Sequence, residues 1–150
     1  MALTFWHVSF TVSDIDRSIG FYRDIVGLKL KSGPRNGGGK GTETGTIVGF
    51  PGARLKVAGL KLNDDCVLEL IQYVYPEGKK RVETQRCDVG SAHVAFLVKD
   101  VQAKYEELKE KGVHFVSAPA RDTRGRPVAY FYDPDGITLE LAGMISDKEP

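Results

Sequence analysis

Hydrophobic and polar residues alternate along two short segments of the chain, and a helical pattern follows each segment. In the first segment, residues 7–12, every second position is apolar, which predicts a strand with one apolar and one polar face. The predicted helix begins after Ser13 or Asp14, which are both good N-terminal caps, and it ends at Gly27. Its apolar stripe consists of Ile15, Ile19, Tyr22 and Val26.

The second half of the chain repeats this pattern. The motif His-Val-x-Phe-x-Val-x-Asp occurs at residues 7–14 and again at residues 93–100. A second motif, Val-Ala followed by Asp and then Leu-Glu-Leu, occurs at residues 57–70 and again at residues 128–141. The second helical stripe follows the second copy of the first motif, at Val101, Tyr105 and Leu108. Such an internal repeat indicates two copies of one structural unit.

Three further strands are predicted in each copy. In the first copy they span residues 46–50, 55–62 and 66–73, and in the second copy residues 114–117, 127–132 and 137–142. The run Asp133-Pro134-Asp135-Gly136 lies between the last two strands and has the residue types of a hairpin turn. The sequence therefore predicts an α+β fold with two βαβββ modules, about residues 3–85 and 90–145, within a single domain of residues 1–150.

The two motifs lie farther apart in the first half than in the second, so the first half carries extra chain. The run from Ser32 to Gly45 supplies this extra chain, and it contains three consecutive glycines, Gly37 to Gly39. Because such a run disfavours both helix and central strand, we expect a loop there. The loop is either a lid over a site or a simple connection.

Composition and charge exclude several classes of function. Hydrophobic residues make up 41% of the 150 residues and charged residues 27%, as in ordinary soluble globular proteins. The net charge of +1 provides no field that would attract nucleic acid or an anionic membrane. With neither a signal peptide nor a membrane-spanning segment, we expect a cytoplasmic protein. The two cysteines, Cys66 and Cys87, form no CxxC motif and are expected to be reduced thiols.

Two histidines and two glutamates lie at equivalent positions of the two halves. His7 and His93 alternate with apolar residues, and Glu69 and Glu140 each lie between two leucines, so all four should project from the face opposite the helices. An unpaired carboxylate in a sheet cavity is costly, and a divalent cation offsets that cost. Two imidazoles and two carboxylates suit Zn²⁺, Fe²⁺, Mn²⁺, Co²⁺ or Ni²⁺. A packing role explains a single histidine such as His114, but not a repeated set of four.

Together with the segment 14–22 and the turn 133–136, these features resemble the vicinal oxygen chelate superfamily, which contains glyoxalases, bleomycin-resistance proteins and dioxygenases. The resemblance covers the chain except for the Gly-rich run and the last few residues. It implies a cupped, half-open, eight-stranded mixed sheet, usually in a homodimer. It also implies one divalent metal ion inside the cup, with the ligands His7, Glu69, His93 and Glu140.

The ligand pattern is most similar to that of bacterial glyoxalase I. Four protein ligands leave about two positions of an octahedron, which suits a substrate with two adjacent oxygens. The resemblance implies a lyase or isomerase that moves a proton α to a carbonyl of a small molecule through a metal-bound enediolate or enolate. Glu140 is the implied catalytic base, and Glu69 and Glu43 are further candidates. After Glu69 the chain lacks the asparagine that follows the equivalent ligand in bacterial glyoxalase I. Methylmalonyl-CoA epimerases carry Gln where this chain has Glu69, so the substrate stays open.

Two other functions are compatible with this sequence. An extradiol-type Fe²⁺ dioxygenase uses two histidines and one glutamate, which would leave Glu69 outside the set of ligands. A metal-free binding or resistance protein would instead use the four polar residues to hold a polar ligand. Several basic residues are candidates for contact with an anionic group of a substrate: Arg54, Lys56, Arg121, Arg124 and Arg126.

Overall fold

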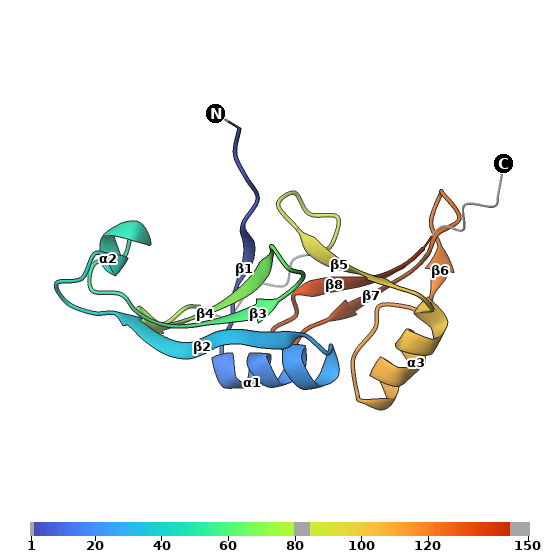
Figure 1. Cartoon of the computed structure of the whole chain (residues 1–150), viewed down its shortest axis with the longest axis horizontal. Coiled ribbons are helices and arrows are strands. Elements are labelled where there is room, and N and C mark those ends of the chain that lie inside the picture. The colour runs from blue at the N-terminus through green and yellow to red at the C-terminus, as the bar shows by residue number, and fades with distance from the viewer. Residues whose placement is uncertain (1, 80–84, 145–150) are drawn as a thin grey trace. The chain divides into compact units, whose positions relative to one another are not determined.

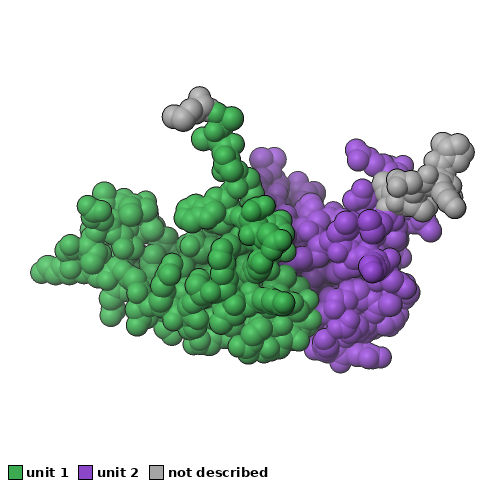
Figure 2. All heavy atoms as spheres, viewed as in Figure 1, with its two compact units in different colours: residues 1–81 green, residues 82–150 purple. Residues whose placement is uncertain are grey.

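The computed structural model describes residues 2–79 and 85–144 of the chain. The chain divides into two compact units, which span residues 1–81 and 82–150 (Figure 2). Each unit contains one four-stranded mixed sheet and has the element order βαβββ, apart from one additional short helix in the first unit. The predicted α+β fold with two βαβββ modules is therefore confirmed.

The first unit begins with a strand and a helical segment, and three further strands follow. The elements in chain order are β1 (His7–Thr11), α1 (Ile15–Gly20), the π-helix η1 (Phe21–Ile25), β2 (Lys29–Gly38), α2 (Thr44–Ile47), β3 (Arg54–Lys61) and β4 (Val67–Tyr75). The strands lie in the order β1-β4-β3-β2 (Figure 1). Strand β1 is parallel to β4, and the other pairs are antiparallel.

The second unit has the same topology. Its elements are β5 (His93–Val98), α3 (Val101–Glu110), β6 (Ala120–Arg121), β7 (Pro127–Tyr132) and β8 (Thr138–Gly143). The strands lie in the order β5-β8-β7-β6, with β5 parallel to β8 and the other pairs antiparallel. In both units, the first strand therefore pairs with the last strand, as expected for two copies of one module.

Both helices form where the sequence predicts them. The side chain of Asp14 caps α1, because its Oδ1 accepts hydrogen bonds from the backbone N–H groups of Asp16 and Arg17, each at 3.0 Å. The helical segment ends before Gly27, which has a φ of +94°. Asp100 caps α3 in the same way. In the described part of the chain, no helix has both the length and the hydropathy that crossing a membrane requires.

Each of the two longer helical segments packs on one face of the sheet of its own unit (Figure 1). The contact buries large apolar side chains completely, among them Ile15, Tyr22, Leu68, Leu70, Leu108, Phe131, Leu139 and Leu141. Each such side chain contributes about 1.5–3 kcal/mol when it leaves water. The helix-facing side of each sheet is thereby occupied, and the predicted ligands on β1, β4, β5 and β8 lie on the other side.

The predicted loop from Ser32 to Gly45 is wrong for residues 32–38, which belong to β2. This strand lies at the edge of its sheet, so it needs hydrogen bonds to β3 alone, and an edge position tolerates glycine and proline. Its register with β3 shifts between Leu30 and Ser32 and again between Ser32 and Arg35. The extra chain of the first half is thus a long, irregular edge strand followed by a short helix.

The predicted strand at residues 46–50 is also wrong, because residues 44–47 form α2. A short apolar run does not by itself distinguish a strand from a helical turn. Gly45 lies against the backbone of the following turn: a Cβ added there would lie 2.7 Å from the carbonyl oxygen of Phe50 and 2.8 Å from the nitrogen of Gly52. This close approach folds the segment back on itself.

In the second unit, the predicted strand at residues 114–117 is reduced to one bridge, between Phe115 and Phe131. The backbone N–H of Val116 still donates to the carbonyl of Tyr130, at 2.9 Å, so the segment runs beside β7 without forming a regular strand. On the edge of β7 opposite β8, the paired strand is β6, which begins at Ala120. The predicted turn at residues 133–136 is confirmed between β7 and β8.

Adjacent glycines of β2 provide a test of this edge strand. Gly38 has a φ of +83°, and a Cβ added there would overlap the carbonyl oxygen of Ala53, whereas a Cβ at Gly37 would meet nothing within 4 Å. We expect Gly38→Ala to lower the free energy of unfolding by more than about 1 kcal/mol, and Gly37→Ala to change it by less than about 0.5 kcal/mol. Urea unfolding measures both, and equal effects of the two substitutions would contradict the described path of β2.

Candidate functional site

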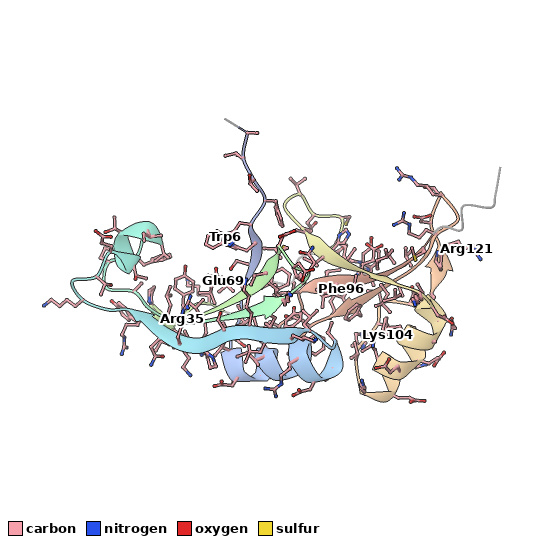
Figure 3. The ribbon with its side chains drawn as sticks, viewed as in Figure 1. Trp6, Arg35, Glu69, Phe96, Lys104 and Arg121 are labelled. Atoms are coloured by element: carbon pink, nitrogen blue, oxygen red, sulfur yellow. The ribbon has the colours of Figure 1, made fainter. Side chains whose placement is uncertain are left out.

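The first predicted pair of ligands lies on neighbouring strands of the first unit. His7 in β1 is opposite Val67 of β4, so Glu69 lies two residues farther along β4, on the same face of the sheet. The distance from Nε2 of His7 to Oε2 of Glu69 is 3.7 Å. Figure 3 labels Glu69 on the first sheet. The leucines on both sides of Glu69 are completely buried, so its carboxylate lies on the face opposite α1.

The second unit repeats this arrangement. His93 in β5 is opposite Thr138 of β8, and Glu140 again lies two residues farther along. The distance from Nε2 of His93 to Oε2 of Glu140 is 3.0 Å. The side chain of Glu140 is 13% exposed and that of Glu69 is 30% exposed, so the second carboxylate is the more enclosed.

The structure thus brings the four predicted ligands together as two pairs, one in each unit. Each pair consists of an imidazole nitrogen and a carboxylate oxygen, which are the donors that borderline divalent cations prefer. Within either unit, the described residues contain no group of three or more His, Cys, Asp or Glu side chains that could hold a metal ion. A single unit therefore supplies two ligands at this face. The donor chemistry of the pairs fits a divalent cation.

Aromatic rings pack edgewise on both histidines. The ring centroids of Trp6 and His7 are 4.7 Å apart, with an interplanar angle of 75°. The centroids of Tyr130 and His93 are 5.2 Å apart, with an angle of 87°. Neither aromatic residue was predicted from the sequence, although alternation along residues 127–132 places Tyr130 on the polar face of β7.

Tyr130 also lies beside Glu140. The two residues are direct cross-strand partners in β7 and β8. Burial raises the pKa of the Tyr130 phenol, and the adjacent Glu140 raises it further through its negative charge and as a hydrogen-bond acceptor. The positive charge of Arg86 opposes this shift. The Tyr130 hydroxyl therefore keeps its proton and is available as a donor to Glu140.

Arg86 is a further polar residue that the sequence analysis missed. Its guanidinium donates a hydrogen bond to the hydroxyl of Tyr132, which lies on the same face of β7 as Tyr130. The ring of His114 stacks on Tyr132 with an interplanar angle of 17° and a centroid distance of 6.0 Å. His114 thus has an aromatic packing partner, and the second sheet carries a cation as well as the His93–Glu140 pair.

Comparison with known proteins identifies the family. The family model of the glyoxalase/bleomycin resistance protein/dioxygenase superfamily matches residues 4–141. The chain belongs to this superfamily. The matched region contains both modules and all four predicted ligands, so the superfamily assignment extends over the whole candidate site.

Relatives in the superfamily have different activities. A 2-epi-5-epi-valiolone epimerase from Actinomyces sp. is 30% identical over 149 residues, which cover 95% of this chain and 80% of the relative. A probable lactoylglutathione lyase from Synechocystis sp. is 29% identical, with coverage of 95% and 97%. A solved glyoxalase family protein from Bacillus cereus superposes with a TM-score of 0.81 at 21% identity, covers 97% of both chains, and supports the fold.

Two of the basic residues proposed as contacts for an anionic group, Lys56 and Arg121, bond to other parts of their own unit. Lys56 forms an ion pair with Asp16, at 3.8 Å, and so points to the helix side of the first sheet. Between β6 and β7, the carboxylate of Asp122 accepts hydrogen bonds from the backbone N–H groups of Arg124 and Arg126. Arg121 donates to the carbonyl of the same hairpin at residue 125. Lys56 and Arg121 thus stabilise local structure.

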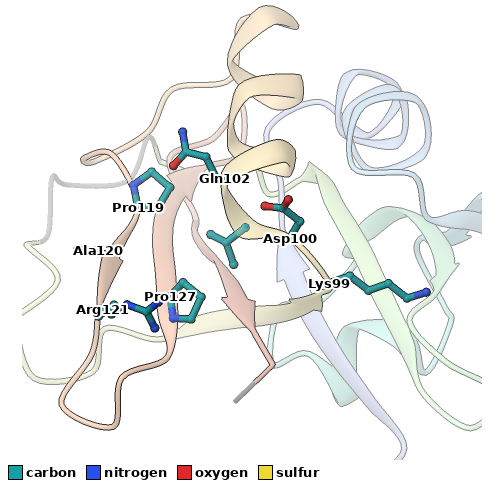
Figure 4. A pocket seen from close by; sticks show the side chains of 8 residues that line it. Lys99, Asp100, Gln102, Pro119, Ala120, Arg121 and Pro127 are labelled. Atoms are coloured by element: carbon teal, nitrogen blue, oxygen red, sulfur yellow. The ribbon is translucent and has the colours of Figure 1, made fainter. Parts of the chain in front are cut away.

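A cavity of about 480 Å³ lies beside the N-terminus of α3 (Figure 4). Its lining includes Asp100, Arg121 and Pro127, and none of the four predicted ligands. Because α3 covers the face of the second sheet opposite Glu140, this cavity is separate from the His93–Glu140 pair.

The turn before β8 places Glu140 and can be tested directly. Asp133 is 5% exposed, and its Oδ1 accepts hydrogen bonds from the backbone N–H groups of Asp135 and Ile137, at 2.9 and 2.7 Å. We expect Asp133→Ala to lower the free energy of unfolding by about 1–3 kcal/mol, because both donors lose their acceptor. Asp133→Asn keeps an Oδ1 acceptor and should have a smaller effect. Unchanged urea unfolding of the alanine variant would show that this carboxylate does not hold the turn.

Proposed function

We propose that this chain, as a homodimer, is a divalent-metal-dependent lyase or isomerase that moves a proton α to the carbonyl of a small molecule. The observation that carries this proposal is the repeated His–Glu pair, with the same strand pairing and the same register in both units. Packing alone does not explain why both units place a carboxylate beside an imidazole, because a partly buried carboxylate is costly.

We infer that both pairs contribute to one site for one divalent ion. Two protein ligands hold a cation weakly, whereas His7, Glu69, His93 and Glu140 together provide two neutral and two anionic donors. Such a set would hold a divalent cation that could also bind a substrate with adjacent oxygens. The metal is one of Zn²⁺, Ni²⁺, Co²⁺, Mn²⁺ or Fe²⁺.

The chemistry follows from the weak acidity of a carbon next to a carbonyl. A cation bound there supplies positive charge that stabilises the oxyanion developing as the proton leaves. Glu140 is the proposed base: its carboxylate would accept the proton from the carbon α to the carbonyl and would return it to the substrate, at the same carbon for an epimerase or at the adjacent carbon for a lyase. His7 and His93 are the two neutral donors of the proposed site. The buried leucines beside each glutamate fix the direction of both carboxylates. The names of the two relatives, an epimerase and a lyase, fit this class of reaction.

Metal binding tests the ligand set first. We expect untagged protein to contain about one divalent ion per chain by elemental analysis. Two double variants remove one pair each: His7→Ala with Glu69→Ala, and His93→Ala with Glu140→Ala. Each should weaken metal binding by more than about 100-fold in a chelator competition, because loss of a residue that only supports a ligand already costs about 10–100-fold in affinity. His114→Ala is the matched control and should bind normally. Full binding by the His7→Ala, Glu140→Ala double variant would exclude this set.

Solvent isotope exchange tests the reaction. In D₂O, the metal-loaded protein should introduce deuterium next to the carbonyl of one of a panel of substrates: 2-epi-5-epi-valiolone, methylglyoxal with glutathione, or methylmalonyl-CoA. Glu140→Gln should lower this exchange by about 100-fold or more, the usual scale for loss of a positioned base. Oxygen consumption with a catechol and no exchange would instead support the dioxygenase. Ligand binding without any metal would support a binding protein.

A further inference from the structure

The two glutamates have different neighbours across the sheet, although their strands have the same topology. Opposite Glu140, in β7, is Tyr130. Opposite Glu69, in β3, is Gly59. In the described residues, His7 is the polar partner of Glu69, whereas Glu140 has both His93 and Tyr130 beside it. The repeat therefore keeps the imidazole–carboxylate pair and changes the residue that supports the carboxylate.

The position of Tyr130 is well fixed. Its backbone lies in the antiparallel ladder between β7 and β8, and its ring packs edgewise on His93 at 5.2 Å. The neighbouring residues 129 and 131 are buried on the opposite face, so the tyrosine cannot leave the Glu140 face without disrupting the core. A phenol held in this way contacts both members of the pair.

The equivalent position in the first unit is glycine, with close neighbours around it. A Cβ added to Gly59 would lie 3.0 Å from Oγ of Ser32 and 3.1 Å from Cγ1 of Val67, so even a small side chain would crowd its neighbours. The different environments of the two carboxylates are therefore built into the packing of each sheet.

We propose that Tyr130 is the positioning residue of Glu140: its hydroxyl donates a hydrogen bond to the carboxylate and holds it in one orientation beside His93. This inference deepens the proposed function and rests on it for the role of Glu140. A donor on one carboxylate oxygen leaves the other oxygen for the cation or for the proton. It also gives the carboxylate a partner when it is not bound to a cation, which Gly59 cannot provide for Glu69. Tyr130 thus distinguishes Glu140 from Glu69.

The first experiment needs neither metal nor substrate. In apo protein labelled with ¹³C at the glutamate carboxyl carbons, Glu140→Gln and Glu69→Gln identify the two signals. Tyr130→Phe, which keeps the ring and removes the hydroxyl, should shift the Glu140 signal and leave the Glu69 signal in place. Tyr132→Phe is the matched control, because Tyr132 lies on the same strand and face but bonds to Arg86; it should shift neither. An unchanged Glu140 signal in a folded Tyr130→Phe protein would overturn the proposal.

The second experiment measures metal affinity by chelator competition. Loss of a hydrogen bond to a ligand usually costs 10–100-fold in affinity, and we expect a loss of about this size for Tyr130→Phe and none for Tyr132→Phe. Unchanged affinity together with loss of isotope exchange would show that the phenol contacts substrate instead, and would overturn the positioning role. If the wild-type protein binds no metal, the proposed function fails, whereas the carboxyl signals still decide whether Tyr130 holds Glu140.

Discussion

The parallel pairing of the first and last strands is the constraint on which each unit depends. In a parallel ladder the register decides which side chains share a face, and a shift of one residue would move every side chain to the other side. In both units the glutamate lies two residues beyond the partner of the histidine. This common register brings a histidine near the start of a module to a glutamate near its end. The short turn before β8 fixes where that strand begins, and the caps of α1 and α3 fix where the helices that follow β1 and β5 begin.

The hydrophobic core enforces this register. In β4 and β8 the glutamate stands between two leucines that are completely buried under the helix of the same unit. A one-residue shift of the strand register would turn the glutamate toward the core and both leucines toward the other face. It would therefore bury a charge and expose two apolar side chains, which are both unfavourable. The polar face of each sheet is thus specified by the apolar face. The same alternation in β7 places Phe131 in the core and Tyr130 beside Glu140.

Much of this could be predicted from the sequence because its signals are local or repeated. Alternation predicted β1 and β5, caps and apolar stripes predicted the helices, and the duplicated motifs predicted two βαβββ modules. The path of residues 32–50 could not be predicted, because an edge strand with glycines needs only one partner, and that partner is distant in sequence. The pairing of Tyr130 with Glu140 was missed for a related reason: each residue lies on a predicted strand, but the register between two strands is a tertiary property.

The pairing of first with last strands also has a consequence for the order of folding. Strand β1 reaches its partner only after the rest of the first unit has been synthesised, and β5 likewise waits for β8. The local helices and the antiparallel β3–β4 and β7–β8 ladders can form earlier, because they close shorter loops. The imidazole and the carboxylate of each pair therefore meet at a late step, when the unit is nearly complete. A chain that ends before its last strand would keep the histidine and the helix but would lack the glutamate, so a partly synthesised unit cannot form the pair.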